Sequence, residues 1–194
     1  LDKTLSDADL RALIITGDGD GFCAGLNLKS MLDANGEMHA TVRENMELQQ
    51  TFAGLVQRLR DNSVVVIAAI NGVAVGAGMA LALAADIRFA AHEASFHVGA
   101  VKIGITAGEC GISYHLPRLI GAGRAFELML SGRPVASKEA LSIGLVSDVT
   151  DRSELMERAL QCARQIVSNA PYSTAHTKRL MWQNLDAPSL QAAI

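Results

Sequence analysis

Aromatic residues are scarce in this sequence of 194 residues, because Phe, Trp and Tyr together make up only 4% of it. Ala, Val, Leu and Ile must therefore fill most of the core, and hydrophobic residues do reach 49%. Charged residues account for 19%, and the formal net charge is −3. This composition excludes an intrinsically disordered chain and predicts a globular protein with a well-buried core.

Cysteine is also rare, and the three that occur are far apart: Cys23, Cys110 and Cys162. No CxxC pair exists, and no cluster of ligand residues has metal-binding spacing, so neither a disulfide framework nor a metal site is expected. Reduced thiols favour a cytoplasmic location. The first residues show no basic and then apolar leader pattern, so no signal peptide is expected. Because the sequence does not begin with Met, we expect it to be a fragment.

Runs of Lys and Arg are absent as well, and basic residues are not interleaved with aromatic ones, which argues against a nucleic-acid partner. One long apolar stretch, residues 64–85, contains Asn71 as its only strongly polar side chain. Its first part is rich in β-branched residues, Asn71-Gly72 is a turn signal, and residues 78–85 suit a helix. We therefore expect a buried strand, a loop and a helix rather than a membrane span.

Strands alternate with helices along the chain, and the central strands are apolar throughout, which predicts an α/β fold with a covered sheet. Gly144 is typical of a helix end, Asp151 with Glu154 resembles a capping box, and Pro171 opens the last helical region. We expect strands at 12–16, 64–70, 86–90, 95–96 and 145–149, and helices at 27–32, 39–60, 78–85, 109–119, 121–130, 137–143, 151–168 and from 171 onward.

Two glycine-containing loops follow apolar strands, at residues 21–28 and 71–78. Neither has the GxGxxG spacing of a dinucleotide site or the GxxxxGK[ST] spacing of a phosphate loop. Each offers a strand-to-helix turn whose backbone N–H groups can hold an anion. The alternative interpretation is that both are simply tight turns.

The order of motifs resembles the enoyl-CoA hydratase/isomerase (crotonase) family. The resemblance rests on five segments in family order: 12–17 with 22–29, 67–78 with 85–90, Phe96 with 101–104, 116–119 and 140–146. It implies a stacked β-β-α superhelix with a C-terminal helical region. Residues 1–150 would form the acyl-CoA-binding core, and 151–194 a helical packing and oligomerisation segment of the same domain. The chain is shorter than usual family members.

The resemblance also implies a site in which two backbone amides hold the thioester oxygen of an acyl-CoA when it gains negative charge. Those amides would belong to Leu26 and Ala77. Coenzyme A contacts would come from Ala24, Leu26, Lys29 and Ala77, although Lys29 could equally be a solvated lysine. Coenzyme A would be part of the substrate, with no permanently bound cofactor. Family members form trimers or hexamers, so a homotrimer or hexamer is expected.

The sequence departs from the family where hydratases carry two glutamates, because Ala80 and Ala100 occupy those positions. Glu109 remains as an acid on the loop before the next helix, where it could shuttle a proton between carbons or could only stabilise the helix N-terminus. Isomerase-like chemistry with one acid therefore fits better than hydration. The alternative is a non-catalytic acyl-CoA-binding or assembly subunit.

Other residues are weaker candidates. His97 lies near the acyl pocket in the family layout, whereas His92 suits a surface loop and His115 a structural position on a helix. Cys23 lacks an evident base partner, and no GxSxG elbow supports serine hydrolysis. Leu26, Met31 and Phe96 indicate an apolar tunnel without defining the acyl chain length.

Overall fold

The computed structural model of the chain describes residues 1–27, 41–104, 106 and 108–193. The first of its two sheets is entirely parallel, with Ile14 of its edge strand opposite Ile67 of the next. Its strands, in spatial order, are β1 (Ala12–Thr16), β3 (Val65–Ile70), β5 (Ile87–Ala91) and β8 (Asp148–Thr150).

The second sheet is built from shorter strands, and its last strand runs antiparallel to the others. In spatial order they are β2 (Gly21–Cys23), β4 (Val73–Val75), β6 (Ser95–His97) and β7 (Val135–Ala136). From β1 to β6 the chain places successive strands alternately in the two sheets. This alternation, with helices between the turns, confirms the predicted stacked β-β-α superhelix.

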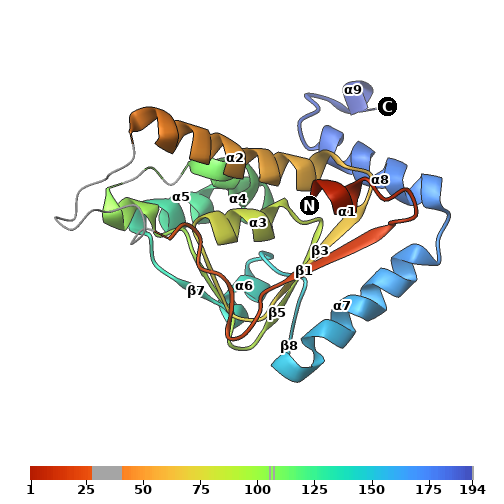
Figure 1. Ribbon diagram of the computed structural model, residues 1–194, viewed down its shortest axis with the longest axis horizontal. Coiled ribbons are helices and arrows are strands. Elements are labelled where there is room, and N and C mark those ends of the chain that lie inside the picture. Colours follow the sequence, from red (N-terminus) through yellow and green to blue (C-terminus); the bar gives the residue numbers. More distant parts are fainter. Residues whose placement is uncertain (28–40, 105, 107, 194) are drawn as a thin grey trace.

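Strand β3 lies at the centre, and all six of its residues are buried. Val66, Ala68 and Ile70 face the main apolar cluster, whereas Ile67 and Ala69 face a second cluster. The second cluster is completed by Leu155, Ala159 and Ala163 of helix α7 (Arg152–Val167), which covers that face of the first sheet (Figure 1). Coverage on both faces explains why this strand is apolar at every position.

The opposite face of the first sheet is covered by helices that include α2 (Val42–Asp61) and α3 (Ala77–Ala84) (Figure 1). A capping box starts α2, with Thr41 Oγ1 accepting from the Glu44 amide and Glu44 Oε2 accepting from the Thr41 amide. None of the described helices is long and apolar enough to cross a membrane. The remaining helical segments are α1 (Asp2–Leu5), η2 (Ala100–Ile103), η3 (Glu109–Gly111), α4 (Ile112–Ile120), α5 (Ala122–Ser131), α6 (Ser137–Ser142), α8 (Pro171–Asn184) and α9 (Leu190–Ala193).

Three local predictions are wrong. Both glycine loops contain a three-residue strand, β2 and β4, where only turns were expected. The helix expected from residue 109 begins as α4 at Ile112, because Cys110 and Gly111 are left-handed and break it. The last strand, β8, starts at Asp148 rather than at residue 145, because the amides of Leu145 and Val146 donate back to the Ala140 carbonyl oxygen of α6.

The capping box predicted at Asp151 is also absent, although Asp151 is the N-cap of α7. Its side chain makes no capping hydrogen bond, and its Oδ1 lies 3.7 Å from Nε2 of His92 instead. Pro171 does open α8 at its first turn, and Gly144 follows α6 with a positive φ of 78°. The helix expected at 27–32 and the residues Lys29 and Met31 fall outside the described residues.

Candidate active site

The first glycine loop leaves β2 at Cys23 and turns at Gly25, whose φ is +83°. A Cβ at Gly25 would stand 2.7 Å from the carbonyl oxygen of Val75 and 3.4 Å from the amide nitrogen of Ala77. Only glycine therefore fits, both for its left-handed backbone and for this close approach. The two loops, 50 residues apart in the sequence, lie against each other at this point.

The second loop leaves β4 at Val75 and turns at Gly76, whose φ of 51° is again positive. Helix α3 begins at the next residue, Ala77, and Gly76 provides no side-chain cap. A Cβ at Gly78 would stand 2.1 Å from the carbonyl oxygen of Cys23. Small residues thus allow the start of α3 to approach the end of β2.

The amides of Leu26 and Ala77 belong to the residues that follow the two turn glycines, Gly25 and Gly76. Within the described ranges, neither amide donates a backbone hydrogen bond, whereas the neighbouring Gly76 amide donates to the His97 carbonyl at 3.0 Å. Ala77 is the first residue of α3, so its N–H has no partner inside the helix and lies at the positive end of the helix dipole. Leu26 and Ala77 are half-buried, and Ala24 is exposed. Such amides suit an anionic oxygen.

Alanines occupy the two positions where the resemblance places hydratase glutamates. Ala80 lies inside α3 and is fully buried, and Ala100 begins η2 after the left-handed Gly99. A methyl group transfers no proton at either position. Any proton transfer at this site must therefore come from another residue.

Glu109 lies on η3, between the left-handed Gly104 and α4. The turn packs against both α2 and α3, so its backbone lies beside the helix that carries Ala77. The position of the Glu109 carboxylate and of Lys29 falls outside what the structure describes. The strained φ of 54° at Cys110, within this turn, was not anticipated from the sequence, since no pattern marks a cysteine for that conformation.

His97 and Ser95 form a pair next to the second loop. His97 is opposite Val75 in the β4–β6 ladder, and Ser95 Oγ lies 3.0 Å from His97 Nε2. Burial, and then the charge of Lys102, lowers the pKa of His97 below its ordinary value, which favours a neutral ring. The hydrogen bond to Ser95 orients the ring, a feature that the sequence alone did not indicate. His92 is exposed, as expected.

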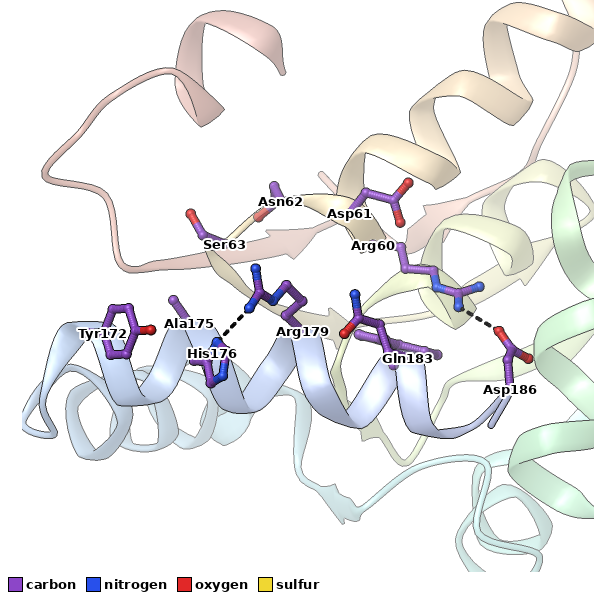
Figure 2. A pocket seen from close by; sticks show the side chains of 11 residues that line it. Arg60, Asp61, Asn62, Ser63, Tyr172, Ala175, His176, Arg179, Gln183 and Asp186 are labelled. Carbon is purple, nitrogen blue, oxygen red and sulfur yellow. Dashed lines mark hydrogen bonds and ion pairs between the residues drawn. The ribbon is translucent and has the colours of Figure 1, made fainter. Parts of the chain in front are cut away.

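Two hollows lie elsewhere on the molecule, on either side of α8. One, of about 460 Å³, lies between the end of α2 and α8, and Figure 2 shows Arg60 and Arg179 among its lining side chains. The other, of about 700 Å³, lies between α8 and the residues around β5, and its lining includes Ile87, Leu119 and Met181. Neither is lined by Leu26 or Ala77.

Comparison with known proteins decides the family. The family model described as enoyl-CoA hydratase/isomerase matches residues 1–194. The chain belongs to the enoyl-CoA hydratase/isomerase family. A probable enoyl-CoA hydratase, EchA12, of Mycobacterium bovis is 40% identical over 190 residues, which cover 96% of this chain and 66% of that protein. Its counterpart from Mycobacterium leprae is 39% identical over 195 residues, covering 98% of this chain and 65% of that protein.

Solved structures of family members agree with the fold. A probable enoyl-CoA hydratase/isomerase from Mycobacterium abscessus has a TM-score of 0.87 at 38% identity, covering 97% of this chain and 70% of that one. A monofunctional enoyl-CoA isomerase from M. smegmatis has a TM-score of 0.81 at 38% identity, covering 99% and 79%. The chain spans about two thirds of the length of the curated relatives it matches.

Proposed function

We propose that the protein is an enzyme that acts on a fatty acyl-CoA thioester through an enolate whose oxygen is held by the amides of Leu26 and Ala77. One observation carries the proposal: Gly25 packs against the backbone of Val75 and Ala77, which brings the two glycine loops together beside two amides that donate no backbone hydrogen bond within the described part of the chain. An enolate oxygen is where negative charge develops when the carbon next to a thioester loses a proton. Preorganised amides stabilise that charge without reorganisation.

The proposed reaction is isomerisation of a 3-enoyl-CoA to a 2-enoyl-CoA with Glu109 as the proton carrier. The Glu109 carboxylate would take a proton from C2, and the electron pair would move toward the thioester oxygen. Return of the same proton to C4 shifts the double bond from C3–C4 to C2–C3, so atoms and charge balance. One acid suffices for this step, which fits the alanines at residues 80 and 100 better than water activation does. The similar structure of a monofunctional enoyl-CoA isomerase from M. smegmatis supports the same choice.

Substrate binding is proposed along the same two loops. Ala24, Leu26 and Ala77 would contact the coenzyme A moiety near its thioester, and Lys29 would meet a phosphate. No permanently bound cofactor is proposed, because coenzyme A enters with the substrate. We also propose a cytoplasmic homotrimer or hexamer, assembled through the C-terminal helices.

A second candidate is a non-catalytic acyl-CoA-binding or assembly subunit. Ala80 and Ala100 favour it, since both lack a group that transfers protons. This candidate keeps the amides as a binding site and leaves Glu109 only to stabilise the helix N-terminus through the helix dipole. It predicts tight binding of acyl-CoA with no turnover.

Purified intact protein should be assayed with 2-enoyl-CoA and 3-enoyl-CoA of several chain lengths, alongside Glu109→Gln and the surface control Glu93→Gln. We expect turnover of 3-enoyl-CoA, a loss of about 10²–10⁴-fold in kcat for Glu109→Gln, and wild-type rates for Glu93→Gln. Full activity of Glu109→Gln on every substrate would remove Glu109 from the mechanism. Acyl-CoA binding without turnover would favour the binding subunit, and hydration of 2-enoyl-CoA would overturn the isomerase assignment.

A further inference from the structure

Two consecutive residues are left-handed directly before α4: Cys110, with φ 54°, and Gly111, with φ 79°. Among the described residues, Cys110 is the only non-glycine with a positive φ. Glycine adopts this conformation readily, whereas a residue with a Cβ loses roughly 1–2 kcal/mol. Such strain persists only where the surroundings impose it. The turn that carries Glu109 therefore requires support from the side chains packed against it.

That support comes from His115 and Val56, which lie directly against the turn. A Cβ at Gly111 would stand 3.4 Å from Cδ2 of His115 and 3.6 Å from Cγ1 of Val56. His115 belongs to the first turn of α4 and is only 3% exposed. Its ring and the Val56 side chain therefore lie at van der Waals distance from that position, and both pack along this side of the turn.

The ring of His115 is itself fixed between two aromatic rings. Tyr114 and Trp182 meet it edge-on, with centroids 5.1 Å and 5.5 Å away. Trp182 belongs to α8, and its Nε1 donates to Oδ1 of Asp86 at 2.7 Å, just before β5. The turn that carries Glu109 is thus linked through His115 to α8, a helix that begins more than 60 residues after Glu109.

Charged side chains also surround the aromatic cluster of Tyr114, His115 and Trp182. Asp186, just after α8, accepts from Arg118 of α4 at 2.8 Å and from the Tyr114 hydroxyl. Arg60, at the end of α2, extends toward Asp186, with a nitrogen–oxygen distance of 3.5 Å (Figure 2). Arg60 also lies over the rings of Tyr114 and Trp182. These contacts tie α2, α4 and α8 together around His115.

We propose that His115 is a positioning residue, which holds the 109–111 turn, with its left-handed Cys110 and Gly111, in place and so sets where Glu109 stands relative to α3. The inference rests on the proposed function, in which Glu109 carries the proton. It does not require the His115 ring to touch substrate.

The protonation state of His115 agrees with a positioning role rather than a proton-carrying one. Burial, followed by the charges of Arg60, Arg88 and Arg118, lowers its pKa to about 4. The ring is therefore neutral near pH 7. Its Nδ1 has no hydrogen-bond partner among the described residues. A neutral ring enclosed by aromatic side chains acts through its shape.

The test compares wild type with His115→Leu, which removes the planar ring at similar volume, and with His92→Leu, which changes an exposed histidine. Two measurements are made: kcat and KM for 3-enoyl-CoA, and hydrogen exchange of the 109–112 amides. We expect His115→Leu to lower kcat by about 10²-fold with KM little changed, because misplacing a reacting group acts on the chemical step. Exchange at 109–112 should accelerate, and His92→Leu should behave as wild type in both measurements.

A double variant identifies the route of the effect. If His115 acts through Glu109, adding His115→Leu to Glu109→Gln should lower kcat no further, whereas a general structural defect would lower it again. If His115→Leu does not fold, His115→Gln replaces it in both measurements. Unchanged exchange at 109–112 would overturn the inference even if the enzyme isomerises 3-enoyl-CoA. Lack of any turnover in wild type would instead count against the proposed function. Hydrogen exchange of the 109–112 amides would then be the only test of the role of His115.

Discussion

Lys178 of α8 and Asp86, just before β5, form a buried ion pair in which Nζ lies 3.0 Å from Oδ2. The lysine side chain is 4% exposed and that of the aspartate 14%. Lys178 Nζ also donates to the carbonyl oxygens of Leu59 and Val64, at 3.1 and 2.7 Å. Burial lowers the pKa of Lys178, and Asp86 opposes that change. The pair therefore anchors α8 to the end of α2 and to the start of β3.

Replacing one member of this pair should be strongly destabilising. Lys178→Met leaves the Asp86 carboxylate buried without its cation, and the expected loss is about 3–5 kcal/mol in the free energy of unfolding. Urea unfolding measures it, with the exposed Lys138→Met as a control expected within about 0.5 kcal/mol of wild type. Combining Lys178→Met with Asp86→Asn should cost less than the two single losses added together. Wild-type stability of Lys178→Met would show that α8 is held by other contacts.

Gly25→Ala should separate the two glycine loops. Its Cβ would meet the Val75 carbonyl oxygen at 2.7 Å in a left-handed conformation that alanine rarely adopts. Displacement of one proposed oxyanion donor is expected to lower kcat for 3-enoyl-CoA by about 10²–10³-fold.

Gly123→Ala is the matched control for that variant. Gly123 lies inside α5, where a Cβ meets no heavy atom within 4 Å, so alanine should raise stability by about 0.5–1 kcal/mol and leave kcat unchanged. Steady-state kinetics and thermal unfolding of both variants provide the comparison. If Gly25→Ala turned over substrate at the wild-type rate, the loop contact would not be part of the site.

The sequence was sufficient to predict the fold where burial leaves a clear pattern. Strand β3 is apolar at every residue because both of its faces are covered, and α2 presents apolar residues at helical spacing. The ordered family motifs then predicted how these elements stack. The two glycine loops were also correctly located, since glycine marks positions where backbones approach closely, as Gly25 and Gly78 do.

Features that depend on tertiary contacts were not predictable. Strands β2 and β4 have three residues each, too few for an alternating pattern to appear. Asp151 has the right spacing for a capping box, but its carboxylate is oriented toward His92. The left-handed Cys110 precedes Gly111, which lies beside the His115 ring, and that ring meets Trp182 on a different helix. No local pattern in the sequence contains that information.

His115 should make the folded protein sensitive to acid. Its pKa is about 4 in the folded protein, against an ordinary value of 6.5, so the unfolded chain binds more protons between these values. The contribution to stability is therefore complete above about pH 6.5 and is lost as the pH falls toward 4, with no further change below.

The full difference corresponds to about 3 kcal/mol, and allowing for solvent screening we expect a loss of about 2 kcal/mol. Urea unfolding from about pH 7 to pH 4.5 should show a shallower decline for His115→Gln, which cannot titrate, than for wild type or the exposed-site control His92→Gln. Parallel declines in all three proteins would mean that the His115 ring is protonated without strain in the folded state.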